Sequence, residues 1–242
     1  MTLDRNPARP GRPRRSRIFG MLWTLGAMAA AQGATLPTGG AVSAGSASIS
    51  VAGSAMTVRQ TTDRAALNWD SFSVGQGNSV RFVQPSATSV ALNRVVGSDP
   101  SVIQGSLSSN GRVFLLNPNG ILFTATSQVN VGGLVASTLG LADADFMAGR
   151  FEFAGASANA VVNEGNIQAL GDGKGGVIAM IAAKVTNTGR LTAEQGSVFL
   201  AAGSKVKLDL GGVVGLEVEQ GALDALVANG GAIVAPGGDV QI

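Results

Sequence analysis

The sequence contains no histidine, no cysteine and no tyrosine. Without the first two, the chain lacks the usual zinc ligands, thiol nucleophiles and disulfides, and the imidazole on which most proton-shuttle catalysis depends. Aromatic residues make up only 5% of the chain. This composition predicts a mechanical or adhesive protein rather than an enzyme, and it predicts no metal or cofactor site.

The first 34 residues have the order of a secretory signal peptide, which is basic, then apolar, then small. The apolar run extends from Ile18 to Ala31 and is followed by small residues through Ala34. It is about fourteen residues long, short of the roughly 20 needed to span a bilayer, so we expect cleavage near Ala31 to Ala34 and no permanent membrane span. An uncleaved anchor and a misassigned start are the alternatives. The basic residues that precede the run are Arg5, Arg9, Arg12, Arg14, Arg15 and Arg17.

Removing this leader reverses the sign of the net charge. The whole chain has 17 basic and 15 acidic residues. Six arginines and Asp4 leave with the leader, so 11 basic and 14 acidic residues remain and the mature net charge is about −3. Because no basic cluster is left to follow a phosphate backbone, nucleic acid is not expected as a partner. The leader predicts that the chain is exported.

A nine-residue pattern, V-x-N-x-G-x-[IL]-x-A, occurs at Val161, Val185 and Val227, with starts 24 and 42 residues apart. Self-similarity of this kind marks a stacked repeat architecture. Since 42 is two intervals of 21, a degenerate copy is expected near Val206, where one coil would be irregular.

Apolar residues alternate within each copy, as a strand with one buried face requires, while Asn and Gly form a turn. A single coil cannot bury its apolar face, but coils stacked about 4.8 Å apart can, and this would align Asn163, Asn187 and Asn229 in a ladder. The sequence therefore predicts an all-β fold, a right-handed parallel β-helix with an N-terminal β cap. Residues 35–242 would form one domain, with the cap and irregular first coils in 35–150 and regular coils in 151–242. A short helix is expected within Leu139 to Phe146.

The two ends of the predicted stack differ. An open stack exposes unpaired backbone, so its beginning needs atypical capping structure. The chain ends at Ile242 within a regular coil, which predicts a fragment or truncated product; a frayed natural terminus is the alternative.

Several blocks between residues 68 and 138 resemble the N-terminal secretion domain of filamentous haemagglutinins. The most specific is Asn110–Phe123 (NGRVFLLNPNGILF), and the similarity covers nearly all of 35–242. The other blocks are Asn68–Val74 (NWDSFSV), Val80–Pro85 (VRFVQP), Ala91–Val95 (ALNRV), Ile103–Leu107 (IQGSL) and Val129–Thr138 (VNVGGLVAST).

The resemblance implies an exported partner of a two-partner secretion system in Gram-negative bacteria. Such a domain would direct a large adhesin, haemolysin or toxin to a dedicated outer-membrane β-barrel transporter, engaging its periplasmic polypeptide-transport-associated domains, in our interpretation by strand addition. Stacking of coils outside the cell would then oppose return of the exported chain through the transporter.

Seven residues are candidates for transporter recognition or for the folding nucleus. The Asn-Pro-Asn-Gly motif forms a tight turn between two strands. In it the proline fixes φ, the second asparagine tolerates left-handed backbone and the glycine relieves strain. A purely structural role is the alternative for each candidate. They are Asn93, Arg94, Asn117, Pro118, Asn119, Gly120 and Ile121.

Two other functions compete with secretion. An adhesin that binds a host surface or glycan is one, although Trp69 is the only tryptophan outside the leader and offers little for sugar stacking. A β-helical polysaccharide-cleaving enzyme is the other, but the spacing of Asp143, Asp145 and Glu152 does not place them across a sugar. The glycine-rich segment Gly171 to Gly176 is interpreted as a corner loop, not a calcium or phosphate loop.

Overall fold

The computed structural model describes Met1 and residues 36–171, 175–211 and 214–242. The predicted signal peptide lies outside the described residues, apart from Met1. The described residues from 36 onward belong to one compact unit, and the fold described below is that of this unit.

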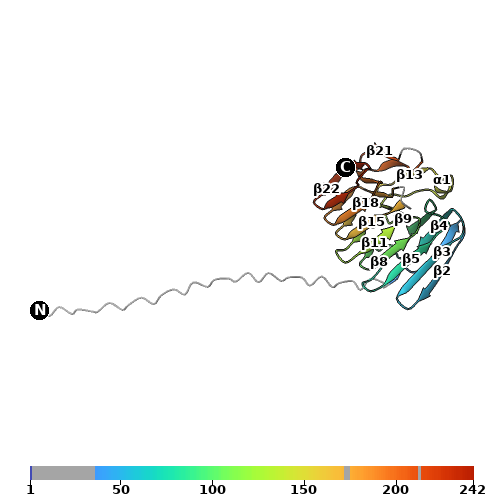
Figure 1. The fold of residues 1–242 in the computed structure, drawn as a ribbon. Coiled ribbons are helices and arrows are strands. Elements are labelled where there is room, and N and C mark those ends of the chain that lie inside the picture. The colour runs from blue at the N-terminus through green and yellow to red at the C-terminus, as the bar shows by residue number, and fades with distance from the viewer. Residues whose placement is uncertain (2–35, 172–174, 212–213) are drawn as a thin grey trace. The chain divides into compact units, whose positions relative to one another are not determined.

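Three sheets form the sides of a parallel β-helix (Figure 1). From β5 onward, each turn of the chain adds one strand to each side in the order face 1, face 2, face 3. Face 1 contains β2 (Ala47–Ala52), β3 (Ala55–Gln60), β5 (Ser79–Val83), β8 (Ser106–Ser109), β11 (Gln128–Val131), β15 (Asn166–Ala169), β18 (Arg190–Ala193) and β23 (Ala232–Val234). Face 2 contains β1 (Ala41–Ala44), β4 (Arg64–Trp69), β6 (Val90–Val95), β9 (Arg112–Leu116), β12 (Gly133–Ser137), β16 (Val177–Ala182), β19 (Ser197–Ala202) and β24 (Val240–Gln241). Face 3 contains β7 (Ser101–Ile103), β10 (Ile121–Phe123), β14 (Ala160–Asn163), β17 (Lys184–Asn187) and β22 (Leu226–Asn229). The predicted all-β parallel β-helix is confirmed.

The N-terminal end is closed by antiparallel strands. β1 pairs antiparallel with β4, and β2 pairs antiparallel with β3, whereas the pairings onward from β3 and β4 within the three faces are parallel. The expected N-terminal β cap is therefore present, and the parallel stack begins at β3, well before residue 151. Irregularity upstream of residue 151 lies in the loops and in one insertion.

Two insertions leave the stack and cover the outside of face 2. The first, between β12 and β14, contains α1 (Asp143–Met147) and β13 (Phe151–Ala154); the second, between β19 and β22, contains β20 (Lys205–Asp209) and β21 (Gly215–Gln220). β13, β20 and β21 form an antiparallel sheet. The short helix expected between Leu139 and Phe146 is thus present, shifted by a few residues toward the C-terminus.

The prediction of an irregular coil near Val206 is wrong. β17 pairs directly with β22, so Val185 and Val227 lie on adjacent coils and no coil intervenes. The longer interval between these two copies is the second insertion, in which Val206 belongs to β20. Sequence spacing alone cannot distinguish a missing coil from a loop inserted into one coil.

The insertions create a second core outside the helix. The interior core includes Ile178, Met180 and Val198, while the outer core includes Ala179, Phe199 and Phe153. Strands buried on both sides read as continuous apolar runs rather than alternating ones, which explains the uninterrupted sequence of β16, all six of whose residues are buried. In the part of the chain that the structure describes, no helix has the length and apolar character to cross a membrane.

Candidate functional site

The Asn-Pro-Asn-Gly motif forms the tight turn between β9 and β10, on the edge between face 2 and face 3. The backbone N–H of Gly120 donates to the carbonyl oxygen of Asn117 at 3.1 Å, and the backbone N–H of Asn119 donates to Asn117 Oδ1 at 2.9 Å. Gly120 has φ +111°, a left-handed conformation that favours glycine. Asn119 does not have a positive φ, so the left-handed tolerance invoked for it is not used.

Asn117 and Asn119 connect this turn to the preceding coil. Asn117 is fully buried, and its Nδ2 donates to the carbonyl oxygen of Asp99 and to Ser101 Oγ, both at 2.9 Å. Asn119 Nδ2 donates to the carbonyl oxygen of Gly97 at 2.8 Å. The two amides therefore fix the position of one corner on the corner below it.

The remaining motif residues divide into a surface group and an interior group. Pro118 is exposed, and its carbonyl oxygen accepts bonds from Ser157 Oγ at 2.7 Å and Asn159 Nδ2 at 2.8 Å, which come from the end of the first insertion. Ile121 is 2% exposed and belongs to the interior core. Of the turn, Pro118 is exposed and Asn119 is partly exposed.

Asn93 points into the interior of the helix, between the inward-facing Ala91 and Val95. Its side chain is fully buried. Asn93 Oδ1 accepts the indole N–H of Trp69 at 3.0 Å, and Asn93 Nδ2 donates to the carbonyl oxygens of Ala91 at 3.2 Å and Phe114 at 3.3 Å. One amide thus bonds to its own coil and to the coils on either side, and as folded it is not accessible to a partner.

Arg94 lies on the opposite side of β6 and holds the first insertion against the stack. Its guanidinium donates to Asp143 Oδ1 at 2.8 Å, to the carbonyl oxygen of Leu141 at 2.6 Å and to Asn68 Oδ1 at 3.1 Å. Asp143 Oδ2 also accepts a bond from Ser43 Oγ at 3.0 Å. Arg94 therefore joins face 2 to the first insertion, and Asp143 joins that insertion to the cap. The Arg94 side chain stays 24% accessible.

The charged groups around the insertions are paired near the surface. Arg150 contacts Asp145 at 2.6 Å, and Lys205 contacts Glu219 at 2.7 Å. The hydrogen bond and charge of Glu219 raise the pKa of Lys205 above its ordinary value, whereas burial lowers the pKa of Arg112. These pairs tie α1 to the turn that follows it and β20 to β21.

The predicted asparagine ladder is present along face 3. Asn163 Nδ2 donates to Asn187 Oδ1 at 2.8 Å, and Asn187 Nδ2 donates to Asn229 Oδ1 at 2.7 Å. Asn163 and Asn187 are fully buried, while Asn229 is exposed at the last coil. The ladder holds adjacent corners in register.

A second amide network, which the sequence analysis missed, occupies the corner between face 1 and face 2 in the first coils. Gln84 Nε2 donates to Gln60 Oε1 at 3.1 Å, and Gln84 exchanges two 2.8 Å bonds with Asn110 through its backbone N–H and carbonyl oxygen. Gln84 Oε1 also accepts a bond from Ser109. The sequence feature that could have revealed this network is the spacing of Gln60, Gln84 and Asn110, which are 24 and 26 residues apart, about the length of one coil.

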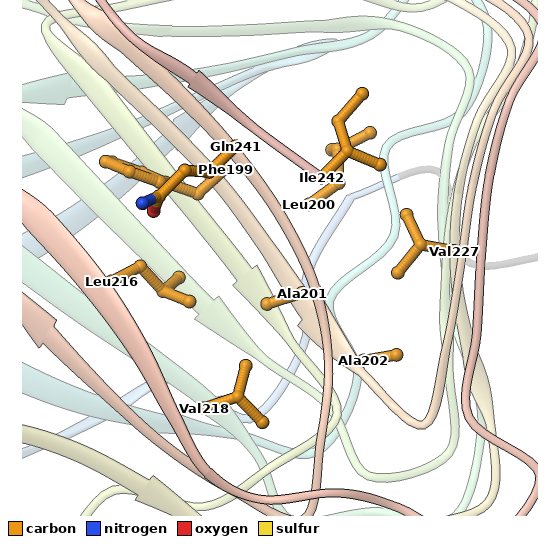
Figure 2. Close-up of a pocket in the computed structure, with 9 residues that line it drawn as sticks. All are labelled: Phe199, Leu200, Ala201, Ala202, Leu216, Val218, Val227, Gln241 and Ile242. Carbon is orange, nitrogen blue, oxygen red and sulfur yellow. The ribbon is translucent and has the colours of Figure 1, made fainter.

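A cavity of about 480 Å³ lies beside β19 at the C-terminal end of face 2, where β24 pairs with only part of that strand. Figure 2 shows the nine residues that line it, drawn from β19, β21, β22 and the last two residues of the chain. Gln241 is the one polar residue among them; the others are Phe199, Leu200, Ala201, Ala202, Leu216, Val218, Val227 and Ile242.

The carboxylates weighed as a glycosidase site all belong to the first insertion. Asp143 and Asp145 are paired with Arg94 and Arg150, and Glu152 lies opposite Lys207 in the β13–β20 pairing. Among the described residues, no group of three or more acidic side chains could hold a metal ion. The centre of the loop Gly171 to Gly176, residues 172–174, lies outside the described residues.

Comparison with known proteins gives a consistent result. A family model described as the TPS secretion domain matches residues 33–242. A heme/hemopexin-binding protein of Haemophilus influenzae strain Rd is 35% identical over 219 residues, which is 86% of this chain and 23% of that protein. A second Haemophilus influenzae protein of the same name is 48% identical over 83 residues, 34% of this chain and 9% of its own length.

Two solved structures share the fold. The crystal structure of the HMW1 secretion domain from Haemophilus influenzae matches with a TM-score of 0.75 and 30% identity, covering 84% of this chain and 55% of that one. The crystal structure of a filamentous hemagglutinin secretion domain matches with a TM-score of 0.55 and 16% identity, covering 82% and 75%. The chain spans 23% of the length of the first relative, so its likeness concerns one part of that protein.

Proposed function

The chain belongs to the TPS secretion domain family, and on that premise we propose that it is the N-terminal targeting module of a large exoprotein. In this proposal the module passes through the periplasm, is recognised by its cognate outer-membrane β-barrel transporter and seeds β-helix folding at the cell surface. The observation that carries the proposal is the match over 33–242 together with the shared fold of the HMW1 secretion domain.

The way the coils are joined supports the folding role. The Asn117, Asn93 and Gln84 side chains each bond to a neighbouring coil, and the ladder of Asn163 and Asn187 continues the same arrangement. In a stack of this kind each coil is stabilised mainly by its nearest neighbours. The first coils therefore offer a surface on which later ones add, so folding outside the cell would oppose return of the chain without nucleotide hydrolysis.

Transporter recognition would use the periplasmic polypeptide-transport-associated domains of the partner. Of the seven candidate residues, Pro118 and the accessible parts of Arg94 and Asn119 are available to such a partner on the folded surface. Asn93, Asn117 and Ile121 are buried and would act through folding. In a chain that is still unfolded, all seven would be accessible.

The proposal assigns this segment to secretion and gives it neither catalysis nor haem binding. Haem iron in proteins is held by His, Cys, Met or Tyr, and the chain contains six Met but none of the other three. Of its methionines, Met56 and Met180 are 4% and 0% exposed and belong to the interior core, whereas Met147 is 37% exposed. The proposal does not assign to this chain the haem and hemopexin binding in the relatives' names.

The test is export that depends on a transporter. Residues 1–242 are produced in a Gram-negative host with each of a panel of two-partner transporters, and the protein in the medium is measured. We expect export with a matching transporter and loss of export when that transporter lacks its periplasmic domains. Export that is equal with and without any transporter overturns the proposal. Glycan binding by the purified chain would instead favour the adhesin alternative.

A further inference from the structure

The antiparallel strands β13 and β20 pair on the outside of face 2, although two full coils separate them in the chain. Phe151 lies opposite Leu208 and Ala154 lies opposite Lys205, so all four residues of β13 take part. The chain between the two strands forms β14 to β19. Among the described strands, β20 alone belongs beside β13, and β21 pairs with the other side of β20. We call the paired strands β13 and β20 the clasp.

The clasp closes the outer core. From β13, Phe151 and Phe153 pack on the outward side of face 2, and from β20, Val206 and Leu208 do the same. The ring of Phe114, on β9, has its centroid 5.1 Å from that of Phe151 and 6.1 Å from that of Phe153. Without β20, one edge of β13 would be unpaired and part of this apolar surface would be exposed. The outer core is therefore complete only when β20 has joined β13.

The position of β20 depends on the coils that precede it. β20 begins at Lys205, three residues after β19 ends at Ala202. β19 pairs with β16, and β16 pairs with β12, the strand that precedes the first insertion. At the base of the clasp, the backbone N–H of Gly155 donates to the carbonyl oxygen of Ser204 at 3.0 Å. β20 can therefore meet β13 in this register only after β16 and β19 have both been added to face 2.

The clasp adds a contact that a simple stack lacks. In a stack held by nearest neighbours, the last coil can unfold without disturbing the coils before it. The first insertion leaves the coil of β12, and the second leaves the coil of β19, two coils later. Since the clasp joins these insertions, the coil of β19 cannot detach unless the outer core opens as well. Three coils thus become one cooperative unit.

We propose that β20 closes the clasp after the interior stack has formed, and that the closed clasp locks the coils of β12, β16 and β19 together. The inference rests on the proposed function and adds the step at which the folded seed resists fraying. In export that begins at the N-terminus, β13 emerges before β20, so the clasp is open until the second insertion arrives. Return of the chain would then require the outer core to open, and not only the last coil to unfold.

Two sets of substitutions open or lock the clasp in the full chain. The opening variant is Val206→Ala with Leu208→Ala; the control is Lys207→Ala, whose side chain is exposed on the other side of the same strand. The locking variant is Glu152→Cys with Lys207→Cys, two exposed residues that lie directly opposite each other. Because the chain has no cysteine of its own, only this disulfide can form within it, and the reduced form is its matched control.

Hydrogen exchange of the purified chain measures the opening of each strand. We expect the opening variant to exchange at least tenfold faster in β13, β16 and β19, while β4 to β6 and the emission of Trp69 stay as in the wild type. Lys207→Ala should change neither. Oxidation of the cysteine pair should slow exchange in β13, β16 and β19 at least tenfold relative to the reduced form.

Pulse labelling during refolding measures the order, and β4 to β9 should become protected before β13 and β20. The proposal is overturned if β13 and β20 are protected first, or if the opening variant exchanges like its control in β16 and β19. Equal exchange in the oxidised and reduced forms also overturns it. So does loss of protection throughout the opening variant, because the interior stack would then not stand without the clasp. Failure of export with every transporter would overturn the proposed function, whereas the exchange results decide the lock separately.

Discussion

Asn163 and Asn187 lie 24 residues apart in sequence, and the side-chain amide of the first donates to the amide oxygen of the second at 2.8 Å. Both side chains are fully buried. The side-chain amide of Asn187 in turn donates to the amide oxygen of Asn229 at 2.7 Å. An amide that is both donor and acceptor along the stack fixes the alignment of three coils.

The ladder predicts that Asn187→Ala is more harmful than Asn229→Ala. Removing the middle amide leaves the buried Asn163 Nδ2 with the carbonyl oxygen of Gly165 but without its closer acceptor, and an unsatisfied buried donor typically costs about 1–3 kcal/mol. Asn229 is exposed, and water can replace it. Urea unfolding of the two variants measures the difference in the free energy of unfolding. Equal losses would show that the ladder does not determine stability.

The interior bond between Trp69 and Asn93 gives a spectroscopic prediction. Asn93→Ala leaves the buried indole N–H of Trp69 without its acceptor, at a cost of roughly 1–3 kcal/mol. Trp69 is the only tryptophan outside the predicted leader, so the emission of the mature chain reports this site directly. We expect a shifted emission maximum and a lower unfolding midpoint. Asn130→Ala, on the exposed side of face 1, serves as the control and should change neither.

A glycine at the corner of face 3 tests how closely the coils approach. A Cβ atom on Gly189 would lie 2.2 Å from the carbonyl oxygen of Gly165 on the preceding coil, whereas one on Gly230 would meet nothing within 4 Å. Gly189→Ala should therefore lose about 1–3 kcal/mol or more through overpacking. Gly230→Ala, in the next corner, should lose far less. A comparison of the two denaturation midpoints decides the point.

The ion pair of Arg94 with Asp143 should be modest in energy, because the two side chains are 24% and 37% exposed. A double-mutant cycle with Arg94→Met and Asp143→Asn is expected to give a coupling of about 0.5–1 kcal/mol that decreases with added salt. Limited proteolysis within residues 139–159 should become faster in either variant. Unchanged proteolysis would mean that Arg94 does not hold the insertion.

The Asn-Pro-Asn-Gly turn allows folding and recognition to be separated. Asn117→Ala removes bonds to Asp99 and Ser101 and should lower the free energy of unfolding by roughly 1–3 kcal/mol. Pro118→Ala keeps the carbonyl oxygen that Ser157 and Asn159 use, so its effect on stability should be small. Export through the matching transporter is measured for both. A loss of export in Pro118→Ala at normal stability would assign the turn a direct contact with the partner.

The alternating pattern predicted face 3 well because this side of the helix is covered on its inner surface alone. Val161, Val185 and Val227 face inward and pair in adjacent coils, as their spacing predicted. The same logic failed on face 2. There both surfaces are buried, so apolar residues do not alternate, and nothing local showed that Asn93 points inward and Arg94 outward.

The sequence by itself determined the stacked β architecture and the asparagine ladder, because both are encoded in residues that recur at the length of one coil. It also determined the family resemblance, because that depends on contiguous blocks such as Asn110–Phe123. Only the tertiary structure decided what covers face 2 and where the residues added between Val185 and Val227 go. Those features depend on contacts between segments far apart in sequence, such as Arg94 with Asp143, and such contacts have no local period.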